Sequence, residues 1–135
     1  MQTFLPYPEF KKTAKLLDYR RLGKQRSEAL TIIRAIEFGN GWSNHPVVKM
    51  WKDHIGALKL YHDVVIEEWV ARGYENNMEL YGVDESVELP PWLGDDRLHR
   101  SHRSNLLRKD QDFYGRYDWD VPSDLDYFWP TKEGY

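Results

Sequence analysis

The sequence contains no cysteine, so it can form neither disulfide bonds nor thiolate metal sites. No apolar run approaches the roughly 20 residues that a membrane-spanning helix requires. The start of the chain lacks the basic and apolar regions of a signal peptide. We therefore expect a cytoplasmic protein that does not enter a membrane. Repeats, low-complexity tracts and alternating strand patterns are also missing, which leaves helices as the expected secondary structure.

Apolar and aromatic residues are plentiful. The 135 residues are 41% hydrophobic and 15% aromatic, with six Trp and nine Tyr. This is too much apolar material for a disordered chain, and the length suits one domain with a real core. We predict a single compact all-α domain over residues 1–135, and we expect it to be a monomer.

The helix signals predict about four helices followed by an extended aromatic tail. The expected helices cover residues 8–23, where Gly23 breaks or kinks the chain, then 24–38, 46–72 and 95–109. The third has apolar residues at spacings of three and four over about 27 residues, so we expect one long central helix. Asn44 or His45 would cap it, and His62 falls on its apolar stripe as an expected core histidine. Residues 110–135 are rich in Tyr and Trp and are expected to wrap the helices in extended form.

The charges are unevenly distributed although the net charge is only −3. Residues 11–34 hold eight Lys or Arg against two acids, and residues 97–109 hold five against none. The rest of the chain is therefore strongly acidic. Such a division could present one positive face to phosphates while the other surfaces repel them. The alternative is a set of solvated helix faces of mixed sign.

The first basic cluster lies in residues 18–26. A junction between helices that carries basic side chains and a glycine suits phosphate binding, because free N–H groups at a helix start add to the side-chain charge. A solvated amphipathic face is the alternative. Gly23 and Gln25 favour function, since solubility does not require them. The expected phosphate-binding residues here are Arg20, Arg21, Lys24, Gln25 and Arg26.

Residues 99–105 form the most unusual stretch. On a helix, His99 and His102 are three residues apart and share one face, while Arg100 and Arg103 share the adjoining face. Arginines can hold phosphates in bidentate fashion, and imidazoles can transfer protons. Histidines three apart could also ligate a metal, with His45 or His54 as a third nitrogen ligand, or they could be structural.

His45 precedes Pro46 at the expected start of the long helix. The helix dipole disfavours a positive charge there and should lower the pKa of the imidazole. A neutral imidazole at this place can act as a base or as a hydrogen-bond donor. A structural histidine is the competing interpretation.

Several segments together resemble the pyrimidine-dimer DNA glycosylase (phage endonuclease V) family, and most closely a bacterial and phage branch of it. The resemblance covers about residues 14–118. Its segments are Asp18-Tyr19-Arg20-Arg21-Leu22-Gly23-Lys24-Gln25-Arg26, Asn44-His45-Pro46, Glu67-Glu68-Trp69-Val70-Ala71-Arg72-Gly73-Tyr74, His99-Arg100-Ser101-His102-Arg103-Ser104-Asn105-Leu106 and Phe113-Tyr114-Gly115-Arg116-Tyr117.

The resemblance implies an all-helical, cofactor-free enzyme that acts on DNA. In this family an N-terminal amine attacks the sugar C1′ beside a pyrimidine dimer, a Schiff base forms, and β-elimination cuts the strand. An acidic side chain stabilises the sugar cation and moves protons. The bulk of Gln2 should leave Met1 in place, so the nucleophile would be the Met1 amine. The family's catalytic glutamate aligns with Arg21, which cannot accept a proton, and Glu28 is the candidate replacement.

The sequence therefore predicts a DNA glycosylase/AP lyase-like enzyme of the base excision repair type, acting on damaged or modified duplex DNA without a metal or other cofactor. The alternatives are a non-catalytic DNA-binding module of the same fold and a histidine-based hydrolase or metal enzyme acting on a nucleotide-like substrate. The expected catalytic residues are Met1, Glu28, His45, His99 and His102. The expected phosphate contacts are Arg20, Arg21, Lys24, Gln25, Arg26, Arg100, Arg103 and Lys109.

Overall fold

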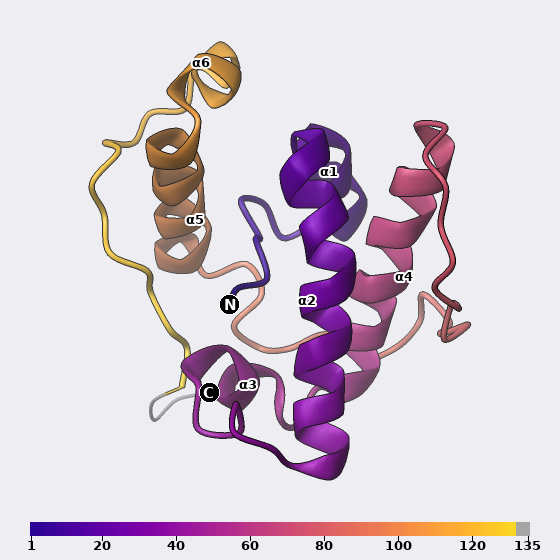
Figure 1. Ribbon diagram of the computed structural model, residues 1–135. Coiled ribbons are helices and arrows are strands. Elements are labelled where there is room, and N and C mark those ends of the chain that lie inside the picture. The colour runs from indigo at the N-terminus through magenta and orange to yellow at the C-terminus, as the bar shows by residue number, and fades with distance from the viewer. Residues whose placement is uncertain (132–135) are drawn as a thin grey trace.

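A computed structural model describes residues 1–131 of the chain and confirms the all-α prediction (Figure 1). The described residues contain helices and no strand. None of these helices combines the length and apolarity needed to cross a lipid bilayer. The helices are α1 (Phe10–Leu16), α2 (Tyr19–Phe38), α3 (Pro46–Trp51), α4 (Ile55–Ala71), α5 (Asp96–Lys109), α6 (Gln111–Tyr114) and the 3₁₀ helix η1 (Gly115–Tyr117).

The first break in the helices falls at Leu17–Asp18 and not at Gly23, so that prediction was wrong. Leu17 has an extended backbone, and the carboxylate of Asp18 caps α2 by accepting from the backbone N–H of Arg21. Helix α2 then runs through Gly23 without interruption. Gly23 is needed for another reason, because a Cβ at this position would lie 2.9 Å from two ring carbons of Trp69. The glycine therefore permits close approach of α4 to α2, which pack against each other.

The predicted long central helix is two helices, α3 and α4, separated by residues 52–54. Neither Gly nor Pro marks this break, so the local sequence could not reveal it. Burial of Trp51 accompanies the break: its indole N–H donates to Thr3 Oγ1 at 3.0 Å, and its ring meets Trp92 edge to face at 4.9 Å. His45 caps α3 by accepting from the Val47 N–H.

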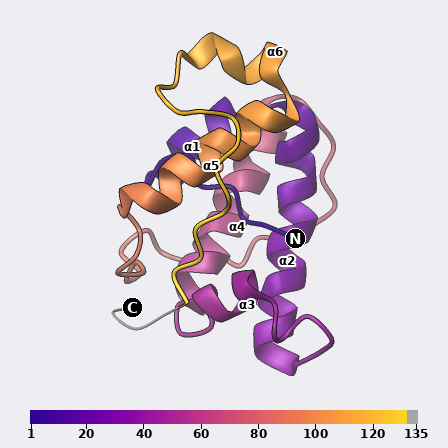
Figure 2. The ribbon, with the colours of Figure 1, turned by 90° about the vertical axis from the view of Figure 1, so that its left-hand side faces the viewer.

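Helix α5 has the predicted bounds, with Asp95 as its cap. The tail differs from the prediction in its first part, because residues 111–117 are helical. Asp118 ends η1 in a left-handed conformation, and residues 119–131 contain no helix and run along α5 toward α3 (Figure 2). Its backbone binds α5 side chains: Leu125 N–H donates to Ser104 Oγ, and Phe128 N–H donates to Ser101 Oγ. Of the predicted tail, residues 132–135 lie outside the described part.

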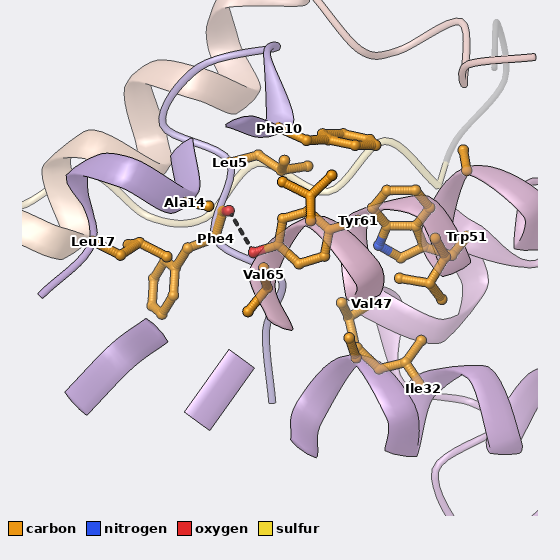
Figure 3. Close-up of a cluster of buried hydrophobic side chains, with 14 of the residues drawn as sticks. Phe4, Leu5, Phe10, Ala14, Leu17, Ile32, Val47, Trp51, Tyr61 and Val65 are labelled. Carbon is orange, nitrogen blue, oxygen red and sulfur yellow. Dashed lines mark hydrogen bonds between the residues drawn. The ribbon is translucent and has the colours of Figure 1, made fainter. Parts of the chain in front are cut away.

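The extended N-terminal segment, residues 2–6, is buried in the middle of the fold (Figures 1 and 3). Leu5 is fully buried, and Phe4 packs in the core beside Leu17 and Val65. The Tyr61 hydroxyl of α4 lies 2.9 Å from the Phe4 carbonyl oxygen and 2.7 Å from Gln25 Oε1, so these two acceptors share its one hydrogen. Because no strand pairs with this segment, side chains must satisfy its backbone polar groups.

Replacing Gly23 with alanine should lower the free energy of unfolding. An exposed helix glycine usually gains about 1 kcal/mol on this change. Here the new methyl group meets the Trp69 ring, and overpacking of this kind typically costs about 1–3 kcal/mol. Urea denaturation measures the difference. Gly41→Ala is the control, because no atom lies within 4 Å of a Cβ built there. Equal or greater stability of Gly23→Ala would contradict the proposed contact.

Candidate active site

A cavity of about 650 Å³ opens where the N-terminus meets the start of α2 and the junction of α5 with α6. It brings together residues from both ends of the chain. Its lining consists of Met1, Gln2, Phe4, Asp18, Tyr19, Arg20, Arg21, Lys24, Gln25, Glu28, Lys109, Asp110, Phe113 and Tyr127. We call this cavity the N-terminal pocket.

The N-terminal pocket carries a positive charge. The Met1 amine and four Lys or Arg side chains line it together with three carboxylates. Two of the cations are held by these carboxylates: Arg21 Nη1 lies 3.2 Å from Asp18 Oδ2, and Lys24 Nζ lies 3.8 Å from Glu28 Oε1. The Lys24 side chain is nevertheless 71% exposed and can reach a ligand. The surplus of positive charge suits a phosphate-containing ligand.

Glu28 is held in a defined position. Its Oε2 accepts a hydrogen bond from Gln25 Nε2 at 2.9 Å, and the same amide group donates to the backbone carbonyl of Gln2, also at 2.9 Å. Gln25 is buried, and its Oε1 accepts from the Phe4 N–H. The carboxylate of Glu28 is thereby linked through one amide to the residue that follows Met1.

Asp18 is a second carboxylate in the pocket, and it was not among the residues predicted to be functional. It accepts from the backbone N–H and the guanidinium of Arg21 and from the hydroxyl of Tyr114. Burial and the contact with Asp18 raise the pKa of Tyr114 well above its usual range, so the hydroxyl stays protonated and donates. Three donors therefore occupy the Asp18 carboxylate, whereas the Glu28 carboxylate accepts one hydrogen bond, from Gln25.

His99 and His102 are not among the residues that line the pocket. The Leu5 N–H donates to His102 Nδ1 at 2.8 Å, and His99 Nδ1 lies 2.7 Å from the Leu5 carbonyl oxygen. His99 Nε2 accepts from the Gly94 N–H, so His99 Nδ1 carries the hydrogen and donates to Leu5. Both imidazoles are buried. Burial lowers the pKa of His99, and it lowers that of His102 to about 3.

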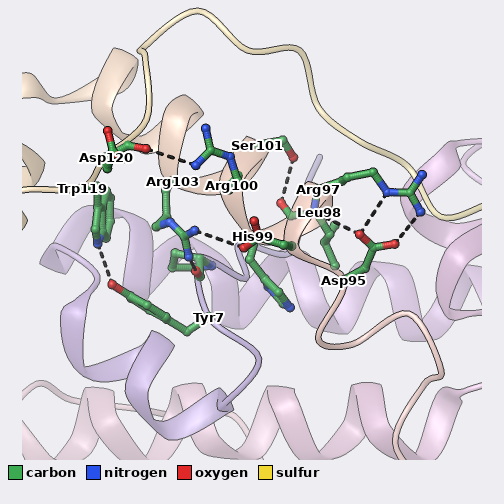
Figure 4. Close-up of polar contacts among 12 residues, drawn as sticks. Tyr7, Asp95, Arg97, Leu98, His99, Arg100, Ser101, Arg103, Trp119 and Asp120 are labelled. Atoms are coloured by element: carbon green, nitrogen blue, oxygen red, sulfur yellow. Dashed lines mark hydrogen bonds and ion pairs between the residues drawn. The ribbon is translucent and has the colours of Figure 1, made fainter.

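The arginines of α5 also contact the protein (Figure 4). Arg103 Nη1 donates to the Pro6 carbonyl at 2.7 Å, and its guanidinium lies over the Tyr7 ring. Arg100 Nη1 donates to the Asp120 carbonyl of the tail. Five residues of α5 were predicted to be functional: His99, Arg100, His102, Arg103 and Lys109. Of these, only Lys109 lines the N-terminal pocket.

Arg26 and His45 also lie outside the pocket lining. The guanidinium of Arg26 lies 4.3 Å from the centre of the Trp69 ring, and its Nη1 donates to Asn76 Oδ1. The place of His45 at a helix start predicted a lowered pKa for its imidazole through the helix dipole. Burial lowers this pKa, with a further contribution from the positive charge of the Met1 amine.

Two other expectations concern histidines and metals. His62 is 1% exposed and its Nδ1 contacts Asp63 Oδ1, which confirms the predicted core histidine. Within residues 1–131, no three His, Asp or Glu side chains form a cluster suited to a metal ion.

Aromatic rings complete the pocket, and their place in it was not predicted from the sequence. Phe4, Phe113 and Tyr127 come from three distant segments and line the same cavity. Phe113 falls in the aromatic stretch that the resemblance had singled out. Phe4 and Tyr127 have no comparable signal in the sequence, because tertiary packing alone brings them together.

A comparison with protein families finds that the model for pyrimidine dimer DNA glycosylase matches residues 1–82. The matched region contains the N-terminal segment and all of α2, which contribute most of the pocket lining. No curated protein and no solved structure matches the chain.

Acidification should destabilise the protein through His102. The pKa of this group is about 3 when folded, against about 6.5 in an unfolded chain, so the unfolded state binds more protons as the pH falls below 6.5. Stability is therefore full above pH 6.5 and falls toward pH 3, with a loss of about 2 kcal/mol at pH 5 from this group. Denaturation at pH 7.5 and pH 5 measures the loss. His102→Asn should make it smaller, and an unchanged pH dependence would contradict the assignment.

Proposed function

The chain belongs to the pyrimidine dimer DNA glycosylase family, and from this premise we propose that it excises damaged pyrimidines from duplex DNA and cleaves the resulting abasic site, with the Met1 amine as nucleophile. The observation that carries the proposal is the place of the N-terminus. Met1 lines a positively charged pocket together with Glu28.

The chemistry follows from an amine beside a carboxylate. The neutral amine attacks C1′ of the sugar, the bond from C1′ to the base breaks, and the base leaves with that electron pair and takes up a proton. Opening of the sugar ring gives a Schiff base between the Met1 nitrogen and C1′. Loss of a proton from C2′ then expels the 3′ phosphate and cuts the strand. In its neutral form the Met1 α-amine has the lone pair that this attack requires.

Glu28 is proposed as the carboxylate that stabilises the sugar cation and accepts protons. Gln25 supports this role, because its amide joins Glu28 to the backbone of Gln2 and so ties the acid to the nucleophile's segment. Arg21 occupies the position of the family's catalytic glutamate, and its guanidinium donates to Asp18. Because an arginine cannot accept a proton, we assign this role to Glu28.

Arg20, Arg21, Lys24 and Lys109 are proposed as the phosphate contacts, because they line the pocket. Gln25 is proposed as a positioning residue. Arg26, Arg100 and Arg103 are left out of the proposed DNA contacts, because they lie outside the pocket lining and donate to protein atoms.

Borohydride should trap the chain covalently on an abasic or dimer-containing duplex, with the adduct on the Met1 nitrogen. Adding one residue before Met1 should abolish trapping, because the amine would leave its place. Glu28→Gln should slow strand cleavage by about 10²-fold, since general acid–base catalysis is typically worth this much or more. Gel electrophoresis and peptide mass spectrometry measure both effects.

Glu37→Gln is the control for Glu28→Gln. Glu37 lies on the same helix but pairs with Lys59 outside the pocket. If the wild-type chain binds DNA and forms no adduct, the protein is a non-catalytic DNA-binding module, and the proposed chemistry is wrong.

Replacing Arg20 and Lys24 together with alanine should weaken DNA binding and reduce its salt dependence. Each lost phosphate contact should reduce the slope of log K against log salt concentration by about one. Arg34→Ala is the matched control, because Arg34 is a cation of the same helix that does not line the N-terminal pocket. Binding titrations by fluorescence anisotropy at several salt concentrations give the slopes. Equal slopes for the double variant and the wild type would show that this pocket does not hold phosphates.

A further inference from the structure

The imidazoles of α5 bind both backbone polar groups of one residue. His102 accepts from the Leu5 N–H, and His99 donates to the Leu5 carbonyl. The Gly94 N–H fixes which nitrogen of His99 carries its hydrogen. One imidazole thus presents an acceptor and the other a donor to the same peptide segment. Arg103 continues the contact at the next residue by donating to the Pro6 carbonyl.

Gln25 of α2 binds the same segment with a similar pattern. Its Oε1 accepts from the Phe4 N–H, and its Nε2 donates to the Gln2 carbonyl, each at 2.9 Å. In an extended chain the backbone groups of residues 2 and 4 point to one side and those of residues 3 and 5 to the other. The segment is therefore bound from α2 on one side and from α5 on the other.

These hydrogen bonds fix which backbone group of residues 2–6 faces each side chain, and so they fix the register of the segment. Sliding the segment by one residue would move each backbone group by about 3.3 Å and turn alternate side chains to the opposite side. His102 would then face no N–H, Gln25 would face the wrong peptide, and Met1 would leave its place in the pocket. Reactions of this kind lose rate steeply when the reacting atoms are displaced by 1 Å.

We propose that His99 and His102 are positioning residues that fix the register of residues 2–6 and thereby place the Met1 amine in the pocket with Glu28. They touch neither substrate nor reacting atoms. The inference rests on the proposed function, because it assigns the histidines to the nucleophile of that reaction. It replaces the expectation that these imidazoles themselves exchange protons with DNA.

The test uses single-turnover cleavage of a duplex that contains one abasic site. His99→Leu and His102→Leu should each slow the step by about tenfold or more while the Kd for this duplex stays within about twofold. His99→Asn and His102→Asn keep a donor or acceptor near the Nδ1 position, and each should recover most of the lost rate. Asn variants that react as slowly as the Leu variants, or Leu variants that react like the wild type, would overturn the proposal.

Ser104→Ala is the matched control on the same helix. Ser104 accepts from the Leu125 N–H of the tail, so its hydroxyl binds the backbone of a different segment. It should alter the stability of the protein without changing the cleavage rate. If Ser104→Ala slows cleavage as much as the histidine variants do, the histidines have only a structural role and the proposal is wrong.

Amide hydrogen exchange separates this inference from the proposed reaction. The Leu5 amide should exchange faster in His102→Leu than in the wild type, whereas His102→Asn should keep it protected. This readout requires no activity. If the wild-type chain does not cleave DNA, the proposed function is wrong, but amide exchange still tests the register of residues 2–6. If the Leu5 amide exchanges equally fast in His102→Leu and in the wild type, the register proposal is wrong.

Discussion

The burial of an extended, unpaired segment is the constraint on which this fold depends. Residues 2–6 pass through the middle of the helices (Figure 1), where water cannot satisfy their backbone N–H and C=O groups. Side chains must do so, because no strand in residues 1–131 pairs with them. This requirement explains why Gln25, Tyr61, His99 and His102 are polar and buried at once. Each binds the backbone of this segment.

The same constraint creates the site. A chain terminus is ordinarily mobile and solvated, whereas here the buried residues that follow Met1 hold it at a pocket. The pocket unites the start of α2 with the end of α5, and both helices also hold the N-terminal segment. The same two helices therefore both hold the N-terminal segment and form the pocket. Loss of either helix contact would affect both.

Local signals in the sequence predicted much of the fold. The bounds of α5 and the end of α2 follow from caps and glycines, and both agree with the structure. The predictions failed where packing between distant residues decides. The break between α3 and α4 has no local breaker, and Trp51 is buried against Thr3 and Trp92, which lie far from it in the sequence. Gly23 is a packing site for Trp69 inside a continuous helix.

The helical class, the family resemblance and the basic cluster on α2 could be recognised without a structure, because they depend on residue types at short spacings. The sequence could not distinguish a histidine that faces DNA from one that binds backbone, since His99 and His102 have the same spacing in either case. The fold places Leu5 against both imidazoles, and each binds a backbone group of this residue. The contact joins residues more than 90 positions apart, and such a pairing depends on how the whole chain packs.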